Sequence, residues 1–433
     1  MREKPTRVSF LIYLIVIHAF IWCIILLMRY LLPLLFVASA IACGGPSSEP
    51  PVDVMVLAPN SNGVFSPQKK RLTTISNIAK LEGNIANFIG NAQMFLDEDD
   101  PAQQSARTIE EFKKAIFQNK GSSVRAQFIE KDGALWPADF HSWAMTTAYW
   151  NLEQAFLYFQ QMYDGRSTKE LLELPVYYWL DTNVQSVDPK ESSTDNAFYW
   201  AGGFRLMGVL PFKDFQTIPM SINFGVMAHE YAHFVFDSRV GSFEARDGLP
   251  ASLLAAMNEG LADFHAFGAT RRLDGKGTVN FLGWTIDMQD AIAARDFSAN
   301  QCMYQDLYLA LHGLPTETFR DEYAAHYLVG TLLASAFYHA AETPEDFDIL
   351  AKSIINAYSS DDLERPGIQQ LYLKYSNEVS LQTVAEVFLS HIPSGRDDLW
   401  CKACNQLVGR LQINATCPAN CSNYKKPQCP SIH

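Results

Sequence analysis

Residues 222–237, INFGVMAHEYAHFVFD, place two histidines and a glutamate inside an apolar run. On an α-helix, residues spaced three and four apart share one face. The apolar residues with this spacing are Phe224, Met227, Ala228, Tyr231, Phe234 and Val235. These apolar residues alone form a continuous stripe that faces the core, so the polar residues are not needed to complete it. The stretch therefore predicts a buried helix that presents His229, Glu230 and His233 on another of its sides.

The two histidines of this helix are one turn apart, so both imidazoles can bind the same cation. Glu230 is offset by one residue from His229 and can act as the base for a water molecule beside that cation. Core packing with stray polar residues is the alternative, because a short H-E-x-x-H pattern also arises by chance. A third ligand elsewhere in the chain would decide between them.

Residues 250–267, PASLLAAMNEGLADFHAF, offer that third ligand. Glu259, on a second predicted helix, can complete a three-ligand zinc set that leaves one position for water. Asp263 follows one turn later and can accept the second ring N–H of a ligand histidine. An ordinary acidic helix face would not require Gly260 and the neighbouring alanines, which allow close helix approach.

Residues 320–341, RDEYAAHYLVGTLLASAFYHAA, add His326 on a third predicted helix. A lone histidine in such a segment is more often structural. Asp321 lies five residues earlier, however, and a carboxylate partner can hold the imidazole protonated. His326 is then a candidate donor to an oxyanion or to a leaving amine.

Together these segments resemble the thermolysin family of zinc metallopeptidases, the gluzincins, over about residues 139–342. The HEYAH motif matches the first zinc motif of that family, and NEGLAD at 258–263 matches its second. The resemblance implies that His229, His233 and Glu259 bind zinc and that Glu230 is the general base.

The same resemblance implies further catalytic residues. Asp263 would lie in contact with a zinc ligand, without binding the metal itself. HYLVG, which begins at His326, resembles the transition-state histidine segment of the family. There His326 and Asp321 would stabilise the oxyanion.

Substrate contacts are implied as well. DNAFYW at 195–200 is similar to the edge strand of the family, so Asn196 and the backbone of Ala197 would bind an extended peptide. Arg295, in AARDFSANQ, is the counterpart of its substrate-carbonyl arginine by spacing.

The chain also departs from the family pattern. No tyrosine lies between His233 and Glu259, where the family has one that helps to stabilise the oxyanion. The segment before residue 139 does not resemble the family propeptide. Its calcium sites are not recognisable, so calcium dependence stays open.

The resemblance implies an α+β fold of two lobes, a mixed α/β N-terminal lobe and a mainly helical C-terminal lobe with the zinc cleft between them. Apolar spacing predicts helices at 72–95, 106–119 and 139–165, whereas 174–187 and 196–212 have the composition of strands. The expected divisions are a leader at 1–43, a tether and N-terminal helical extension at 44–130, an N-terminal catalytic lobe at 131–240, a helical C-terminal catalytic lobe at 241–395 and a disulfide tail at 396–433.

The N-terminal residues suggest export. Residues 8–28 form an apolar run long enough to cross a bilayer. Read from Met28, the chain instead resembles a bacterial lipoprotein signal that ends in AIAC, with Cys43 as the acylated residue. An uncleaved anchor or ordinary secretion is the alternative. Each places the body outside the cytoplasm, in the bacterial cell envelope or beyond it.

Cysteine usage agrees with an oxidising compartment. Besides Cys23 and Cys43, the chain has Cys302, Cys401, Cys404, Cys417, Cys421 and Cys429. A zinc knuckle could use four of the tail thiolates, but export favours three disulfides, whose connectivity cannot be deduced.

A net charge of −13 and the lack of a broad basic face exclude nucleic acid as a partner. We expect a zinc-dependent endopeptidase that acts on a peptide or protein, anchored to a membrane through its N-terminus. One alternative is a catalytically weak zinc-binding envelope lipoprotein with a binding or assembly role. Another is a zinc aminopeptidase, although no Gly-x-Met-Glu-Asn strand precedes His229.

Overall fold

The structure is a computed structural model that describes residues 51–430, except 61–63, 98, 185–193, 202–203, 214–215, 242–248, 287–293, 315, 317–321, 361, 363 and 375–377. The predicted leader with Cys43, and also Asp321, lie outside the described residues. Among the helices that are described, none combines the length and the apolar character needed to span a bilayer.

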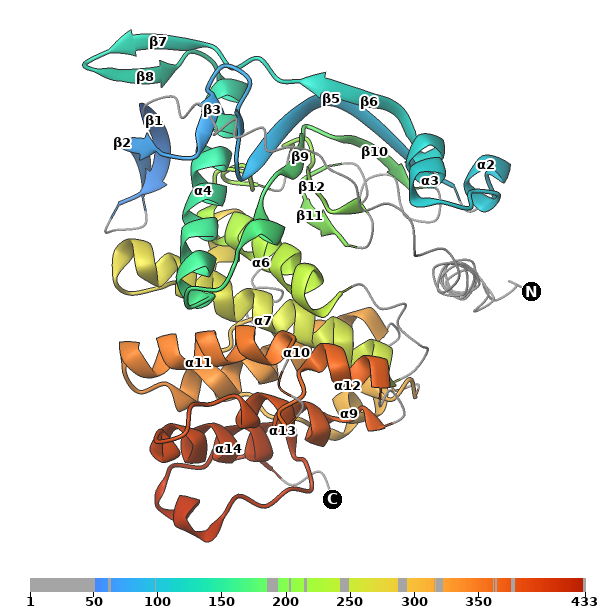
Figure 1. Cartoon of the computed structure of the whole chain (residues 1–433), viewed down its shortest axis with the longest axis vertical. Helices are drawn as coiled ribbons and strands as arrows, with labels where there is room; N and C mark the ends of the chain where they lie inside the picture. The colour runs from blue at the N-terminus through green and yellow to red at the C-terminus, as the bar shows by residue number, and fades with distance from the viewer. Residues whose placement is uncertain are drawn as a thin grey trace, which may run out of the picture.

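Two β-sheets lie at one end of the molecule (Figure 1). The smaller sheet has the order β2-β1-β8-β7. Its strands are β1 (Val52–Pro59), β2 (Phe65–Leu72), β7 (Phe128–Lys131) and β8 (Ala134–Pro137). The larger sheet has the order β11-β12-β9-β5-β4-β3, with β6 and β10 also paired to β5. Its strands are β3 (Ile75–Asn77), β4 (Glu82–Gly83), β5 (Ala86–Leu96), β6 (Phe117–Ser123), β9 (Leu174–Tyr178), β10 (Asp181–Val184), β11 (Ala197–Trp200) and β12 (Leu206–Val209).

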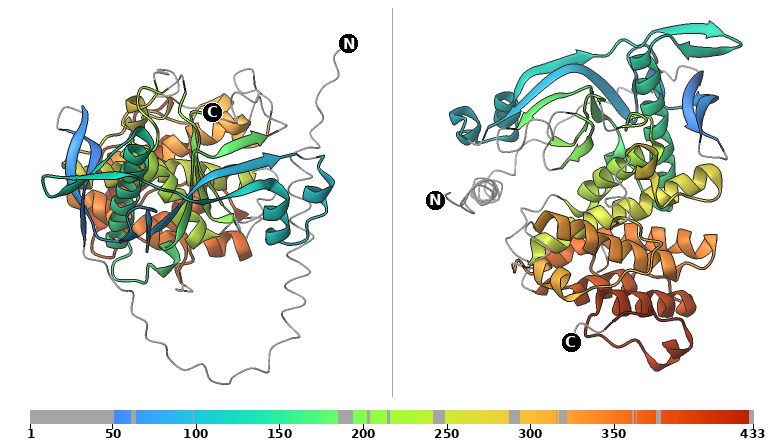
Figure 2. Two further views of the ribbon diagram at one scale, coloured as in Figure 1. Left: turned by 90° about the horizontal axis from the view of Figure 1, so that it is seen from above. Right: turned by 180° about the vertical axis from the view of Figure 1, so that it is seen from behind.

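The helices that follow residue 223 occupy the other end, and the right-hand view of Figure 2 shows them stacked in successive layers below the sheets. The helices before residue 163 lie beside the sheets. The α-helices are α2 (Pro101–Gln104), α3 (Ile109–Ile116), α4 (Phe140–Met162), α6 (Phe224–Val240), α7 (Leu249–Asp274), α9 (Gln305–Leu311), α10 (Glu322–Ala340), α11 (Pro344–Tyr358), α12 (Ile368–Lys374), α13 (Leu381–Ser390) and α14 (Asp397–Leu411). Short 3-10 helices are η1 (Lys169–Leu171), η3 (Phe281–Trp284) and η5 (Ala419–Asn423). Helix α4 packs against β1 and α6, α6 packs against α7, and α7 packs against α10. The molecule is therefore of the mixed α+β class.

Most of the predicted elements are confirmed. Helix α4 starts after Asp139, whose side chain accepts a hydrogen bond from the backbone N–H of Ser142 and so caps the helix. Strands β9 to β12 occupy the two segments with strand composition, and α3 lies inside the second predicted helix.

The helix predicted at 72–95 is wrong, because this segment forms β3, β4 and most of β5. In β5 the buried residues are Ala86, Phe88, Gly90, Ala92 and Met94, which follow a period of two. Spacings of four belong to both periods, so the same residues also fit a helix. Since β5 pairs with both β6 and β9, the described residues 75–96 and 117–123 contribute strands to the larger sheet.

The six cysteines beyond the leader form disulfides, as predicted. The pairs are Cys302–Cys429, Cys401–Cys421 and Cys404–Cys417. Two bridges fasten the tail to α14, and the third joins the tail to the loop before α9. The zinc-knuckle alternative is excluded, since all four thiolates it would need are oxidised.

Helices α7 and α10 approach closely at a pair of glycines. A Cβ atom added to Gly260 would lie 1.9 Å from the carbonyl oxygen of Gly330, which no side-chain rotation can relieve. The small residues noted in the sequence thus allow α7 to pack directly on α10, which fixes the position of Glu259.

We predict that Gly260→Ala destabilises the protein by at least ~2 kcal/mol, because the backbones of α7 and α10 must separate. Denaturant unfolding followed by circular dichroism measures the change. Gly90→Ala is the matched control, since its Cβ would meet only the Val124 Cγ1 atom at 3.1 Å. Equal stability of the two variants would contradict the close approach.

Candidate metal centre

The candidate metal centre begins with the start of α6. The Asn223 side chain accepts hydrogen bonds from the backbone N–H groups of Gly225 and Val226, at 3.0 and 3.3 Å, and so caps the helix. Asn151 of α4 donates to the carbonyl of Ser221 at 3.0 Å. These bonds fix where α6 enters the core.

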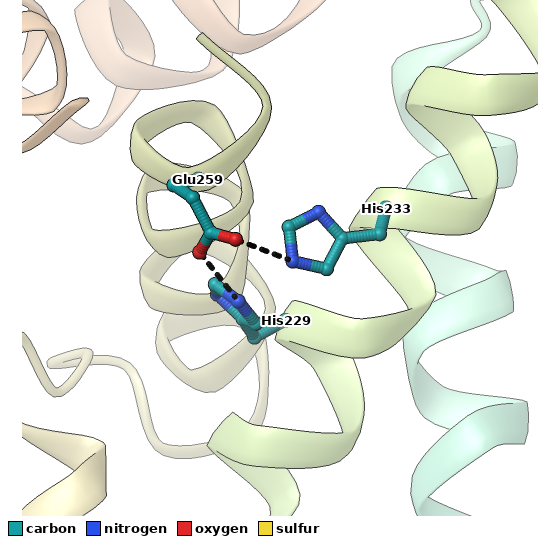
Figure 3. Close-up of side chains that lie close together, drawn as sticks. All are labelled: His229, His233 and Glu259. Carbon is teal, nitrogen blue, oxygen red and sulfur yellow. Dashed lines mark ion pairs between the residues drawn. The ribbon is translucent and has the colours of Figure 1, made fainter. Parts of the chain in front are cut away.

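His229 and His233 of α6 and Glu259 of α7 point toward one another (Figure 3). His229 Nε2 lies 3.5 Å from Glu259 Oε2, and His233 Nε2 lies 3.7 Å from Glu259 Oε1. One ligand atom from each residue falls within 4.8 Å of the other two. Three residues that were predicted as ligands from separate motifs are therefore brought together.

The outer nitrogen of each imidazole has a partner of its own. His229 Nδ1 lies 2.8 Å from Asp263 Oδ1, and His233 Nδ1 lies 2.8 Å from Asn258 Oδ1. Since both partners accept, each Nδ1 carries the hydrogen and each Nε2 is directed at the shared centre. Asp263 takes the place predicted for it. The role of Asn258 was missed, although its position next to Glu259 in NEGLAD was a signal.

Arg295 lies beside these carboxylates. Its Nε and Nη2 atoms donate to the two oxygens of Asp263 at 3.0 and 2.7 Å, and Nη2 is 3.6 Å from Glu259 Oε2. Its guanidinium also stacks on the ring of Tyr327, 4.8 Å from the ring centroid. Arg295 is thus at the site, where it neutralises Asp263. The substrate contact proposed for it stays a prediction.

Burial and the neighbouring charges set the pKa values of the metal-free site. Burial alone would lower the pKa of His229, but Asp263 and Glu259 reverse this effect and raise it to about 9. Burial lowers the pKa of His233 to about 4 despite the attraction of Glu259. Burial would raise the pKa of Asp263, yet Arg295 and His229 hold it at about 2. A divalent cation would displace the proton from His229 and take its place between the carboxylates.

Glu230 projects from α6 toward the sheet. Burial raises its pKa to about 7, and the carboxylate accepts a hydrogen bond from the backbone N–H of Tyr199 in β11. Tyr199 Oη also donates to Asp237 Oδ2 at 2.8 Å, which ties β11 to α6 a second time. The predicted base therefore borders both the ligand trio and the edge of the sheet.

Strand β11 is at the edge of the larger sheet within the described strands. The carbonyl of Asn196 accepts from Leu210 N at 2.9 Å and so faces β12. Because backbone groups alternate along a strand, those of Ala197 and Tyr199 face the open edge. Asn196 and Ala197 thus lie where an extended chain could pair with the sheet.

The donor set fits a zinc ion. Two imidazole nitrogens and one carboxylate are a known catalytic zinc set, which leaves a position open. Glu259 Oε2 is buried and has no hydrogen-bond partner among the described residues. A cation at the centre of the trio would satisfy that oxygen.

His326 lies half-buried on α10, and its catalytic role stays a prediction. Its suggested partner, Asp321, lies outside the described residues.

No protein-family model matches the chain, and no curated protein matches it. Among solved structures, the precursor of protealysin, a metalloproteinase from Serratia proteamaculans, is similar with a TM-score of 0.45 and 16% sequence identity. The match covers 74% of this chain and 87% of that one. A likeness at this TM-score carries no inference about function, so the case for a metal centre depends on the geometry of the trio.

We predict that Asp263→Asn weakens zinc binding by roughly 10- to 100-fold, because the amide no longer stabilises the His229 tautomer that directs Nε2 at the centre. Competition with a chromophoric chelator measures the dissociation constant. Asp274→Asn, the same change at the end of α7, keeps an acceptor for the backbone N–H groups of Lys276 and Gly277 and should bind zinc normally. Equal affinity of both variants would show that Asp263 does not orient a ligand.

Proposed function

We propose that the protein is a zinc-dependent metalloendopeptidase. The observation that carries this proposal is the convergence of His229, His233 and Glu259, with both outer imidazole nitrogens hydrogen-bonded and the carboxylate of Glu230 beside them. In this arrangement His229, His233 and Glu259 would bind zinc. The ion would supply Lewis-acid chemistry, lowering the pKa of a water molecule and polarising the scissile carbonyl.

Glu230 would act as the general base and then as the general acid. Its buried carboxylate accepts a proton from the attacking water and delivers it to the leaving amine. The hydrogen bond from Tyr199 N–H holds the carboxylate in place between the strand and the trio. His326, with Asp321, would donate to the oxyanion, as the sequence resemblance implies.

The substrate would bind as an extended chain along β11. The edge-facing backbone of Ala197 would pair with the peptide main chain, and the exposed side chain of Asn196 would bind at one end of it. Arg295 has donors beyond the two that Asp263 uses, and we assign them to a substrate carbonyl. This mode of binding favours internal peptide bonds over chain ends.

The location outside the cytoplasm is part of the same proposal. Three disulfides are consistent with an oxidising compartment. Lipid anchoring through Cys43 depends on the leader sequence alone.

A zinc-binding protein of low activity is the second candidate. The observation that favours it is the lack of a tyrosine between His233 and Glu259. In that case the same trio would bind zinc for a binding or assembly role, and Glu230 would be dispensable.

We predict that Glu230→Gln lowers kcat/KM for a quenched peptide library by roughly 10²- to 10⁴-fold, because the amide cannot accept the proton. Zinc content should stay at about one ion per chain. Glu386→Gln, an exposed change on α13, is the control. Removal of the metal with a chelator should abolish cleavage, and added zinc should restore it.

Zinc binding without any cleavage that depends on Glu230 would contradict the peptidase proposal and favour a zinc-binding protein of low activity. Release of single N-terminal residues in the same assay would indicate an aminopeptidase instead.

A further inference from the structure

A cavity of about 310 Å³ lies away from the metal trio, where the C-terminal ends of several helices meet. It is lined by Arg166 after α4, Arg239 in the last turn of α6, Asn356 in α11, Arg365 before α12 and His391 at the end of α13. The cavity brings together four segments of the chain, around residues 166, 239, 356–365 and 391.

The lining is strongly positive, although the whole chain carries a net charge of −13. Three guanidinium groups face the cavity, and Asp362 is the acidic residue in the lining. Glu170 lies 3.8 Å from Arg239 Nη1 and offsets part of that charge. One or more positive charges are therefore left without a counter-charge among the described residues that line it.

Part of this arrangement is explained by helix ends. Arg166 Nε donates to the carbonyl of Tyr163 at 3.3 Å, and Arg239 Nη2 donates to the carbonyl of Ser359 at 3.2 Å. Arginines at helix C-termini stabilise such carbonyls and the helix dipole. This structural role uses only some of the five N–H donors on each guanidinium.

Other nitrogens of the lining have no such partner. Arg239 Nε and His391 Nε2 are both buried and lack a hydrogen-bond partner among the described residues. His391 Nδ1 donates to the carbonyl of Val387 at 2.9 Å, so Nε2 becomes a donor to an anion only when the ring is protonated. A buried donor without an acceptor, as Arg239 Nε is here, costs free energy, which an anion in the cavity would recover.

Repulsion among the positive groups that line the cavity also favours a negatively charged ligand. Burial lowers the pKa of Arg166 and the charge of Arg239 lowers it further, and the nearby Asp164 and Glu170 offset this only in part. Burial likewise lowers the pKa of His391; Arg365 and Arg166 add repulsion, and the Val387 carbonyl and Asp362 oppose it only in part. A water molecule could accept one hydrogen bond here, but only an anion would relieve the repulsion among these groups.

We propose that this cavity binds a tetrahedral oxyanion, either inorganic phosphate or the phosphate group of a small ester. One guanidinium is enough to pair with a flat carboxylate, whereas a phosphate has about two negative charges and oxygens in several directions. The three arginines of this cavity come from separate segments, so they can contact a phosphate from several directions. The volume leaves room for a small group attached to the phosphate.

The site would be independent of the proposed peptidase activity. Arg239 nevertheless follows His233 by six residues on α6, so the bound anion would contact the helix that carries two of the candidate metal ligands.

Isothermal titration of sodium phosphate into the full chain, at pH 7.5 and constant ionic strength, tests the proposal. We expect saturable binding of about one phosphate per chain with a Kd below about 1 mM, and binding of acetate at least tenfold weaker. Glycerol phosphate is titrated in parallel, and the tighter of the two phosphates identifies the source of the anion.

Arg365→Gln should weaken phosphate binding at least tenfold. Its side chain is exposed and takes part in none of the ion pairs of the described residues, so folding should be unchanged in a thermal melt. Arg125→Gln, an exposed arginine between β6 and β7, is the matched control and should bind phosphate normally. Glu259→Gln should also bind phosphate normally, because it alters only the metal centre.

Three results would overturn the proposal. They are the lack of saturable binding, equal affinity of Arg365→Gln and the unmodified chain, and loss of phosphate binding in Glu259→Gln with Arg365→Gln unaffected. The last result would place the phosphate at the metal centre.

Discussion

His229 donates its Nδ1 hydrogen to Asp263, and the geometry of the centre depends on this bond between α6 and α7. It directs the Nε2 atom toward Glu259 and holds the two helices at a fixed rotation about their axes. The bond lies in the core, where Arg295 supplies the opposite charge that a buried carboxylate needs. Close packing of α7 on α10 at Gly260 and Gly330 then leaves α7 no freedom to move away. The candidate centre is therefore preorganised before any metal arrives.

The sequence predicted which residues lie together at the candidate site better than it predicted the strands, and the roles of these residues stay predictions. The candidate ligand trio and Asp263 were predictable because metal ligands need particular residue types at helical spacing. Such a pattern can be read from one short motif, as in HEYAH and NEGLAD. The strands of residues 72–95 were missed, since the buried residues of β5 at a period of two also satisfy a period of four. The hydrogen bond from Tyr199 N–H to Glu230 could not be predicted, because every residue except proline has a backbone N–H and the residue type therefore does not reveal this donor. The pairing of Arg295 with Asp263 depends on a loop whose path no periodicity describes.

Helix α6 connects two regions of opposite electrostatic character. Its middle turns carry the histidines that face carboxylates of α7, and its last turn carries Arg239 in a cavity lined by arginines. Cation binding at one region and anion binding at the other would both stabilise this helix. Because a helix transmits small shifts along its axis as a rigid element, the two proposed ligands have a physical route for influencing each other.

The Cys302–Cys429 bridge has a consequence for how the chain matures. Residues 301–303 are held by α14 as well, through Arg410, which donates to the Gln301 carbonyl and accepts from Met303 N through its own carbonyl, both at 2.7 Å. The segment that begins at Arg295 is thus fastened by residues synthesised more than a hundred positions later. Helices α6 and α7, which carry the candidate metal ligands, can pack while the chain is still being made. The loop that carries Arg295 is secured only after the tail has been translated and its disulfide has formed. Completion of the candidate centre is in this way coupled to formation of the Cys302–Cys429 disulfide.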